Sequence, residues 1–138
     1  MIIKSEQEML DFGKNFAKSL KSHVIELIGD VGAGKTTFTR GLAEGLGIKE
    51  SITSPSFTIS KSYPLPNHKG RLIHYDFYRL PDPGLMLDDL RENLENPDNV
   101  IVIEWGKSIE NTLPKNHTKI EIKYNENNTR EISLWNYI

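Results

Sequence analysis

The chain has 138 residues, of which 37% are hydrophobic and 26% are charged, and it contains no cysteine. The length predicts a single domain over residues 1–138, and the lack of cysteine excludes disulfides, zinc–cysteine sites and iron–sulfur clusters. Lys and Arg number 17 against 19 Asp and Glu, and this net charge of -2 argues against a protein whose main activity is to bind nucleic acid through its phosphates.

Two helices and one buried strand are predicted in the first third of the chain. Residues 5–8, Ser-Glu-Gln-Glu, fit a capping box, and apolar residues then recur at helical spacing: Met9, Phe12, Phe16 and Leu20. Residues 23–28 are nearly all apolar, which is typical of a strand buried on both faces of a parallel sheet. A second helix is expected from about Lys35 to Leu46, and Gly41 and Gly45 are expected to let it lie close to that sheet.

The rest of the chain is predicted to form strands, loops and one further helix. Three strands are expected, at residues 57–63, 71–76 and 100–103, the last of them fully buried. A helical segment is expected between Pro81 and Leu94. Residues 119–124 and 129–135 alternate on either side of an Asn-rich turn, which predicts a C-terminal β-hairpin. This order indicates an α/β domain with a mostly parallel central sheet flanked by helices.

No part of the chain is expected to enter a membrane. The first residues do not form a signal peptide, and no apolar run approaches the ~20 residues that a membrane helix needs. We therefore expect a cytoplasmic protein.

A phosphate-binding pattern follows the first buried strand. Residues 29–36, Gly-Asp-Val-Gly-Ala-Gly-Lys-Thr, match the P-loop pattern G-x-x-x-x-G-K-[ST] in full. Glycines let successive N–H groups point at phosphate oxygens, and the start of the next helix adds N–H groups and the positive end of its dipole. Lys35 is expected to reach the β- and γ-phosphates, and the Thr36 hydroxyl to bind Mg²⁺. The alternative is a turn that only joins strand to helix. The predicted nucleotide-binding residues are Gly29, Asp30, Val31, Gly32, Ala33, Gly34, Lys35, Thr36 and Thr37.

Two carboxylates that follow predicted strands are candidates for the metal site of this loop. Asp76 follows residues 72–75, and Glu104 follows residues 100–103. Because the carboxyl ends of strands line the ligand crevice of an open parallel sheet, both acids can face the loop. The alternative for either acid is a structural role, as a helix cap or as the partner of a base such as Arg79. The Asn/Thr-Lys-x-Asp pattern of guanine-selective GTPases is missing, which favours ATP over GTP.

Three further segments follow the loop: residues 53–58 (Thr-Ser-Pro-Ser-Phe-Thr), 74–80 (His-Tyr-Asp-Phe-Tyr-Arg-Leu) and 103–105 (Ile-Glu-Trp). Together with Gly-Asp-Val-Gly-Ala-Gly-Lys-Thr-Thr, they closely resemble the bacterial TsaE family over about residues 1–110. The members of that family are small P-loop ATPases that assist the threonylcarbamoylation of the tRNA adenosine beside the anticodon. The resemblance implies a single P-loop NTPase-like domain that binds and hydrolyses ATP with Mg²⁺.

The resemblance also implies roles for single residues. Thr36 and Glu104 resemble the Mg²⁺ ligands of the family, and Asp76 resembles its Walker B-type aspartate. With Lys35, the two acids form the expected catalytic group. The stretch around Ser5 resembles the part that lies near the adenine, although the capping box alone accounts for this serine. Four switch-like residues beside the γ-phosphate are implied: Ser54, Ser56, Thr58 and Trp105. A core role is the alternative for the tryptophan.

Partners are implied by the resemblance alone. The chain would act with the TsaB and TsaD proteins, of which TsaD transfers the carbamoyl group to tRNA, and its own ATP hydrolysis, weak in isolation, would support repeated turnover. The net charge of -2 agrees with tRNA being held indirectly, through a partner. Two other functions stay open. One is a small-molecule P-loop kinase, although no insertion is long enough for an arginine-bearing lid, and the other is a nucleotide-gated binding module that does not hydrolyse ATP.

Overall fold

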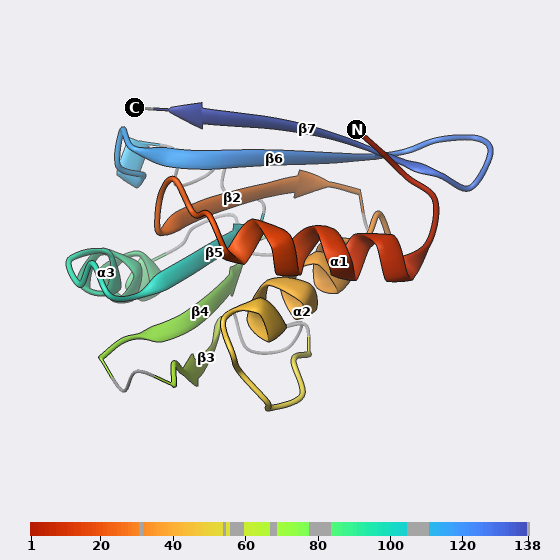
Figure 1. Ribbon diagram of the computed structural model, residues 1–138. Helices are drawn as coiled ribbons and strands as arrows, with labels where there is room; N and C mark the ends of the chain where they lie inside the picture. The colour runs from red at the N-terminus through yellow and green to blue at the C-terminus, as the bar shows by residue number, and fades with distance from the viewer. Residues whose placement is uncertain are drawn as a thin grey trace.

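The described part of the protein forms a seven-stranded sheet with helices on both faces (Figure 1). The computed structural model describes residues 1–30, 32–53, 55, 60–66, 69–77, 84–104 and 111–137. Within these ranges, no helix has the length and apolar character needed to cross a membrane. The strands are β1 (Ile2–Ile3), β2 (Val24–Gly29), β3 (Ser60–Pro64), β4 (Arg71–Asp76), β5 (Val100–Glu104), β6 (His117–Tyr124) and β7 (Arg130–Tyr137). The helices are α1 (Glu6–Ala17), α2 (Lys35–Gly45) and α3 (Gly84–Leu94).

The centre of the sheet is parallel and its flanks are antiparallel. The strands stand in the order β1-β7-β6-β2-β5-β4-β3. The neighbours β6, β2, β5 and β4 pair parallel, whereas β3 pairs antiparallel with β4, and β7 pairs antiparallel with both β6 and β1. The predicted α/β fold with a mostly parallel central sheet and a C-terminal hairpin is confirmed. The sequence pattern does not predict β1, because two residues carry no periodicity.

Different helices cover the two faces of the sheet. In β5, Val100 and Val102 pack into the core beneath α1 and α2, whereas Ile101 and Ile103 pack into the core that α3 covers through Leu90. Each of these five side chains is buried. The strand is therefore buried on both faces, as its continuous apolar run predicts.

Glycines line the interface between α1 and α2, which lie side by side (Figure 1). A Cβ atom built on Gly41 would lie 2.3 Å from the carbonyl oxygen of Leu10, and one built on Gly45 would lie 2.7 Å from that of Lys14. Both of these neighbours belong to α1. The expectation that Gly41 and Gly45 let α2 approach the sheet is therefore wrong, because the close approach that they permit is between two helices.

Replacing Gly41 with alanine tests this close packing. Alanine normally stabilises a helix by about 1 kcal/mol over glycine. Here we expect Gly41→Ala to lower the free energy of unfolding by about 1–3 kcal/mol, because the backbone at Leu10 would have to move. Equilibrium urea denaturation measures the change. Asn15→Ala, at an exposed position of α1, is the control and should change stability by less than about 0.5 kcal/mol. A stabilised Gly41→Ala variant would contradict the packing.

Candidate functional site

A glycine-rich loop joins β2 to α2 at the edge of the sheet where the parallel strands end. Gly32 and Gly34 have φ angles of 83° and 114°, in the left-handed region that favours glycine. A Cβ atom on Gly29 would lie only 2.7 Å from the carbonyl oxygen of Ile122 in β6, so close contact between β2 and β6 also requires glycine there. Gly34 is the N-cap of α2 and makes no side-chain capping bond. The start of α2 can therefore offer backbone N–H groups and its positive dipole end to an anion.

Lys35, the first residue of α2, folds back over this loop. Its ammonium group donates to the carbonyl oxygen of Gly29 and, at 3.2 Å, to that of Asp30. The same Nζ atom lies 4.0 Å from Oε1 of Glu104, and the lysine side chain is buried. Burial lowers the pKa of Lys35, while the carboxylates of Glu104, Asp76 and Asp30 oppose that shift. The loop thus holds a desolvated cation among carboxylates that favour its charged form.

Glu104, the last residue of β5, is held by two neighbours. Its Oε1 faces Lys35, and its Oε2 lies 2.5 Å from Nε2 of His74, a residue of β4 that is completely buried. Both side chains are buried, so this carboxylate depends mainly on these partners for its polar contacts. His74 begins the segment 74–80 that carries part of the family resemblance, but the sequence pattern does not predict its contact with Glu104. It stands two residues before Asp76 on the same buried strand.

The surroundings of His74 indicate which of its ring nitrogens carries the proton. Among the described residues, its Nδ1 atom is buried without a hydrogen-bond partner. A protonated Nδ1 would be a buried donor left unsatisfied, and a charged ring would have one as well. With the proton on Nε2, the ring donates to Glu104 and leaves Nδ1 as a buried acceptor, not as a buried donor.

Asp76 and Glu104 end neighbouring strands side by side. The register of β4 and β5 places them directly opposite each other, and the N–H of Phe77 donates to the carbonyl oxygen of Glu104 at 3.2 Å. Glu104 is in turn opposite Leu27 of β2, close to the start of the glycine-rich loop. The structure therefore brings the predicted group of Lys35, Asp76 and Glu104 together at one edge of the sheet.

The oxygen donors at this edge suit Mg²⁺ in combination with a phosphate ligand. Thr36 lies in the first turn of α2, and Asp76 and Glu104 supply carboxylates. Among the described residues, no cluster of three or more His, Cys, Asp or Glu side chains is placed to hold a metal by itself. Mg²⁺ is commonly bound through one or two carboxylates together with substrate phosphates and water. The residues that are present fit that manner of binding.

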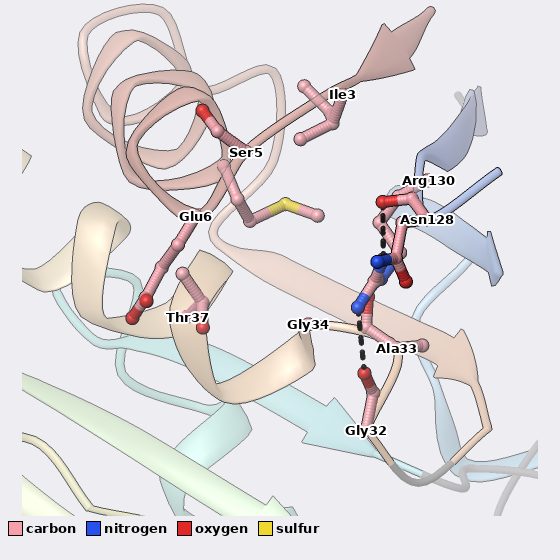
Figure 2. A pocket seen from close by; sticks show the side chains of 10 residues that line it. Ile3, Ser5, Glu6, Gly32, Ala33, Gly34, Thr37, Asn128 and Arg130 are labelled. Atoms are coloured by element: carbon pink, nitrogen blue, oxygen red, sulfur yellow. Dashed lines mark hydrogen bonds between the residues drawn. The ribbon is translucent and has the colours of Figure 1, made fainter.

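A pocket of about 430 Å³ lies beside the loop (Figure 2). Its lining comes from three parts of the chain: the segment that leads into α1, the loop with the first turn of α2, and the hairpin between β6 and β7. Ser5 and Glu6 line it from the first part, Thr37 from the second, and Asn128 and Arg130 from the third. Ser5 accepts a hydrogen bond from the N–H of Glu8 at 3.1 Å, which confirms its predicted role as N-cap. The two hairpin residues were not anticipated from the sequence.

Several predicted site residues lie outside the described part of the chain. These are Val31 of the loop, the switch-like residues Ser54, Ser56, Thr58 and Trp105, and the alternative partner Arg79. Their roles stay predictions.

The fold and the loop define a class of protein, namely an α/β domain that carries a P-loop sequence motif at the carboxyl edge of a central parallel sheet. A family model described as "Threonylcarbamoyl adenosine biosynthesis protein TsaE" matches residues 3–132. The chain belongs to the TsaE family, as the resemblance of its motifs suggested.

Relatives of known name and structure agree with this assignment. The tRNA threonylcarbamoyladenosine biosynthesis protein TsaE of Haemophilus influenzae is 38% identical over 140 residues, which cover 96% of this chain and 85% of the relative. The protein of the same name from Bacillus subtilis is 44% identical over 116 residues, or 80% and 68% of the two chains. The crystal structure of YdiB from B. subtilis matches with a TM-score of 0.79 and 34% identity, over 100% of this chain and 84% of that one.

A double-mutant cycle tests the buried contact between His74 and Glu104. His74→Leu should lower the free energy of unfolding by about 3–5 kcal/mol, because the buried carboxylate loses its donor. Combining it with Glu104→Leu should recover part of this loss and give a coupling energy of at least about 1 kcal/mol. His74→Gln, whose amide N–H can replace the ring Nε2–H, should cost less than His74→Leu. Urea denaturation measures all four variants, and strictly additive losses would contradict the contact.

Proposed function

We propose that this chain binds ATP with Mg²⁺ at the glycine-rich loop and hydrolyses it in support of threonylcarbamoyl transfer to the tRNA adenosine next to the anticodon. The observation that carries the proposal is the convergence of Lys35, Asp76 and Glu104 beside the loop between β2 and α2. Membership of the TsaE family supports the link to tRNA threonylcarbamoyladenosine biosynthesis.

Each part of the site has a distinct task in this proposal. Backbone N–H groups of the loop and of the start of α2 bind the phosphates. Lys35 exchanges its bonds to loop carbonyl oxygens for bonds to the β- and γ-phosphates, which are stronger because both partners are charged. Thr36 and Glu104 hold Mg²⁺, with Asp76 beside them. The metal supplies positive charge that offsets the charge developing on the transferred phosphoryl group.

The pocket beside the loop is suited to the nucleoside part of the nucleotide. A phosphate chain held by the loop leaves the sugar and base to occupy adjoining space, and the pocket adjoins Gly32, Gly34 and Thr37. Its wall from the first part of the chain includes Ser5, which agrees with the position near the adenine that the family resemblance implies. The absence of a guanine-specificity motif favours ATP over GTP in this pocket.

The proposed partners are the TsaB and TsaD proteins, with tRNA reached only through them. The small net charge of -2 supports an indirect contact with tRNA. Ser54, Ser56, Thr58 and Trp105 are proposed to sense the γ-phosphate and so to report the nucleotide state to the partners. The proposed location of this reaction is the cytoplasm.

Phosphate release from ATP distinguishes the proposed function from its two alternatives. We expect the purified chain to release phosphate into water with Mg²⁺, slowly alone and faster when TsaB and TsaD are added. Phosphate transferred to an added small-molecule acceptor would favour a kinase. Tight ATP binding without phosphate release, even with both partners present, would favour a nucleotide-gated binding module.

Removing the Lys35 ammonium group tests the phosphate site directly. We expect Lys35→Ala to weaken ATP binding by about 100-fold and to abolish measurable turnover, since charged hydrogen bonds to the phosphates are lost. Isothermal titration measures the affinity, and phosphate release measures the turnover. Lys21→Ala, at an exposed position outside the site, is the control. Near-normal affinity and turnover in Lys35→Ala would refute the assignment of the loop.

Neutralising Glu104 separates metal binding from nucleotide binding. Glu104→Gln keeps an oxygen that can accept from His74 but removes the charge that Mg²⁺ requires. We expect the Mg²⁺ concentration for half-maximal hydrolysis to rise by about tenfold, while nucleotide affinity changes less than about threefold. Titration of Mg²⁺ at saturating ATP provides the measurement, with the exposed Glu95→Gln as control. An unchanged Mg²⁺ requirement would make Glu104 a structural residue.

A further inference from the structure

The C-terminal hairpin reaches the glycine-rich loop through one arginine. The strand β6 lies parallel to β2, with Ile122 opposite Gly29, so the end of β6 extends past the point where β2 ends. Arg130 is the first residue of β7 and stands opposite Tyr124, the last residue of β6. Its side chain points from the hairpin to the loop, across 97 residues of sequence (Figure 2).

Among the described residues, the guanidinium group of Arg130 donates only to backbone carbonyl oxygens. Its Nε donates to Ala33 at 3.0 Å, its Nη1 donates to Asn128 at 3.1 Å, and its Nη2 makes a longer contact of 3.5 Å with Gly32. Two of these three acceptors belong to the glycine-rich loop. The described residues place no carboxylate within ion-pair distance of this arginine, so the loop carbonyl oxygens are its main polar partners.

The hairpin holds the arginine in position for these bonds. The guanidinium carbon lies 4.0 Å from the ring centroid of Tyr124, which restricts the side chain from one face. The backbone of Arg130 pairs with Ile3 in β1. Asn128, which accepts from Nη1, occupies the turn with a left-handed φ of 65°, a conformation that asparagine tolerates better than most residues. Contacts within the protein therefore orient the N–H donors of Arg130 before any ligand binds.

A loop that turns its N–H groups toward a phosphate turns many of its carbonyl oxygens outward. Gly32 and Gly34 make this curvature possible, but glycine also has the largest backbone freedom to lose. Bonds from a fixed donor to the outward carbonyl oxygens of Gly32 and Ala33 reduce that freedom before a ligand arrives. Reduced freedom in the free protein lowers the cost of ordering the loop when a ligand binds.

We propose that Arg130 is a positioning residue of the phosphate site. By holding the carbonyl oxygens of Gly32 and Ala33, it keeps the loop in the curvature that directs N–H groups to a phosphate, and it makes nucleotide affinity depend on the C-terminal hairpin. The inference rests on the proposed function, because it concerns how the same loop is prepared for phosphate.

Two substitutions separate hydrogen bonding from charge. Arg130→Met keeps the aliphatic stem and removes every N–H donor. Arg130→Lys keeps the positive charge, but its single ammonium nitrogen cannot reproduce the planar set of donors of the guanidinium group. Arg71→Met is the matched control, since Arg71 is an exposed arginine at the start of β4 that likewise donates to a backbone carbonyl oxygen, that of Ser62.

Amide hydrogen exchange at residues 32–34 of the nucleotide-free protein is the direct measurement. We expect the exchange rate there to rise about tenfold in Arg130→Met. It should also rise in Arg130→Lys and stay unchanged in Arg71→Met. ADP affinity, measured by titration, should fall about tenfold in Arg130→Met and should not be restored in Arg130→Lys. Once ATP saturates the site, kcat should stay within about twofold of the wild-type value, because the arginine acts on the loop and not on the reacting atoms.

Other results would overturn the proposal. An unchanged exchange rate of the loop in Arg130→Met would overturn it, even if ADP affinity fell. Full recovery of ADP affinity in Arg130→Lys would also overturn it, because the charge would then act on the phosphate directly. If wild-type protein bound no nucleotide, the proposed function would fail. Raised loop exchange in Arg130→Met would then still support a positioning role for the arginine.

Discussion

The parallel pairing of β2 with β5 on one side and with β6 on the other is the constraint on which the whole site depends. Parallel pairing brings the carboxyl ends of these strands to one edge of the sheet. The register then sets the contacts, because Glu104 stands opposite Leu27 and Ile122 stands opposite Gly29. A shift of β5 by one residue would turn Glu104 to the other face of the sheet and separate it from Lys35. The acid and the loop therefore meet only in this register.

The buried group of Lys35, Glu104 and His74 is not explained by stability. Burial lowers the pKa of Lys35, because removal from water disfavours the charged ammonium group. Buried ion pairs such as that of Lys35 with Glu104 also often stabilise a protein less than apolar side chains of the same volume. The ammonium group bonds to carbonyl oxygens of its own loop, although carboxylates or phosphates would bind it more strongly. A site that keeps such a cation and a carboxylate 4.0 Å apart is suited to a ligand that contacts both. This electrostatic arrangement supports a phosphate ligand with a bound cation.

The parts of the fold that depend on local pattern were predictable from the sequence, and those that depend on sheet order were not. The loop, the buried strands and the hairpin are each predicted by a pattern that spans only a few residues. The contact of His74 with Glu104 joins residues 30 apart, and that of Arg130 with Ala33 joins residues 97 apart, so both require knowledge of which strands are neighbours. The prediction that Gly41 and Gly45 let α2 approach the sheet was wrong for a related reason. Helical spacing does not indicate which neighbouring element a row of glycines contacts. Ser54, Ser56, Thr58 and Trp105 remain predictions from the family resemblance.

Segments near both ends of the chain lie beside the P-loop motif and line the same pocket. The N–H of Ile132 in β7 donates to the carbonyl oxygen of Met1 at 2.8 Å, and β1 pairs with β7 at Arg130, so the N-terminal strand is held by the C-terminal hairpin. Both segments line the pocket beside the loop (Figure 2). The family match, over residues 3–132, spans both of these segments and the motif between them. A ligand that binds only the assembled pocket stabilises every element that forms its walls. Under the proposed function, nucleotide binding is therefore linked to the pairing of β1 with β7, and the P-loop motif is one of three segments, far apart in the sequence, that bind the nucleotide together.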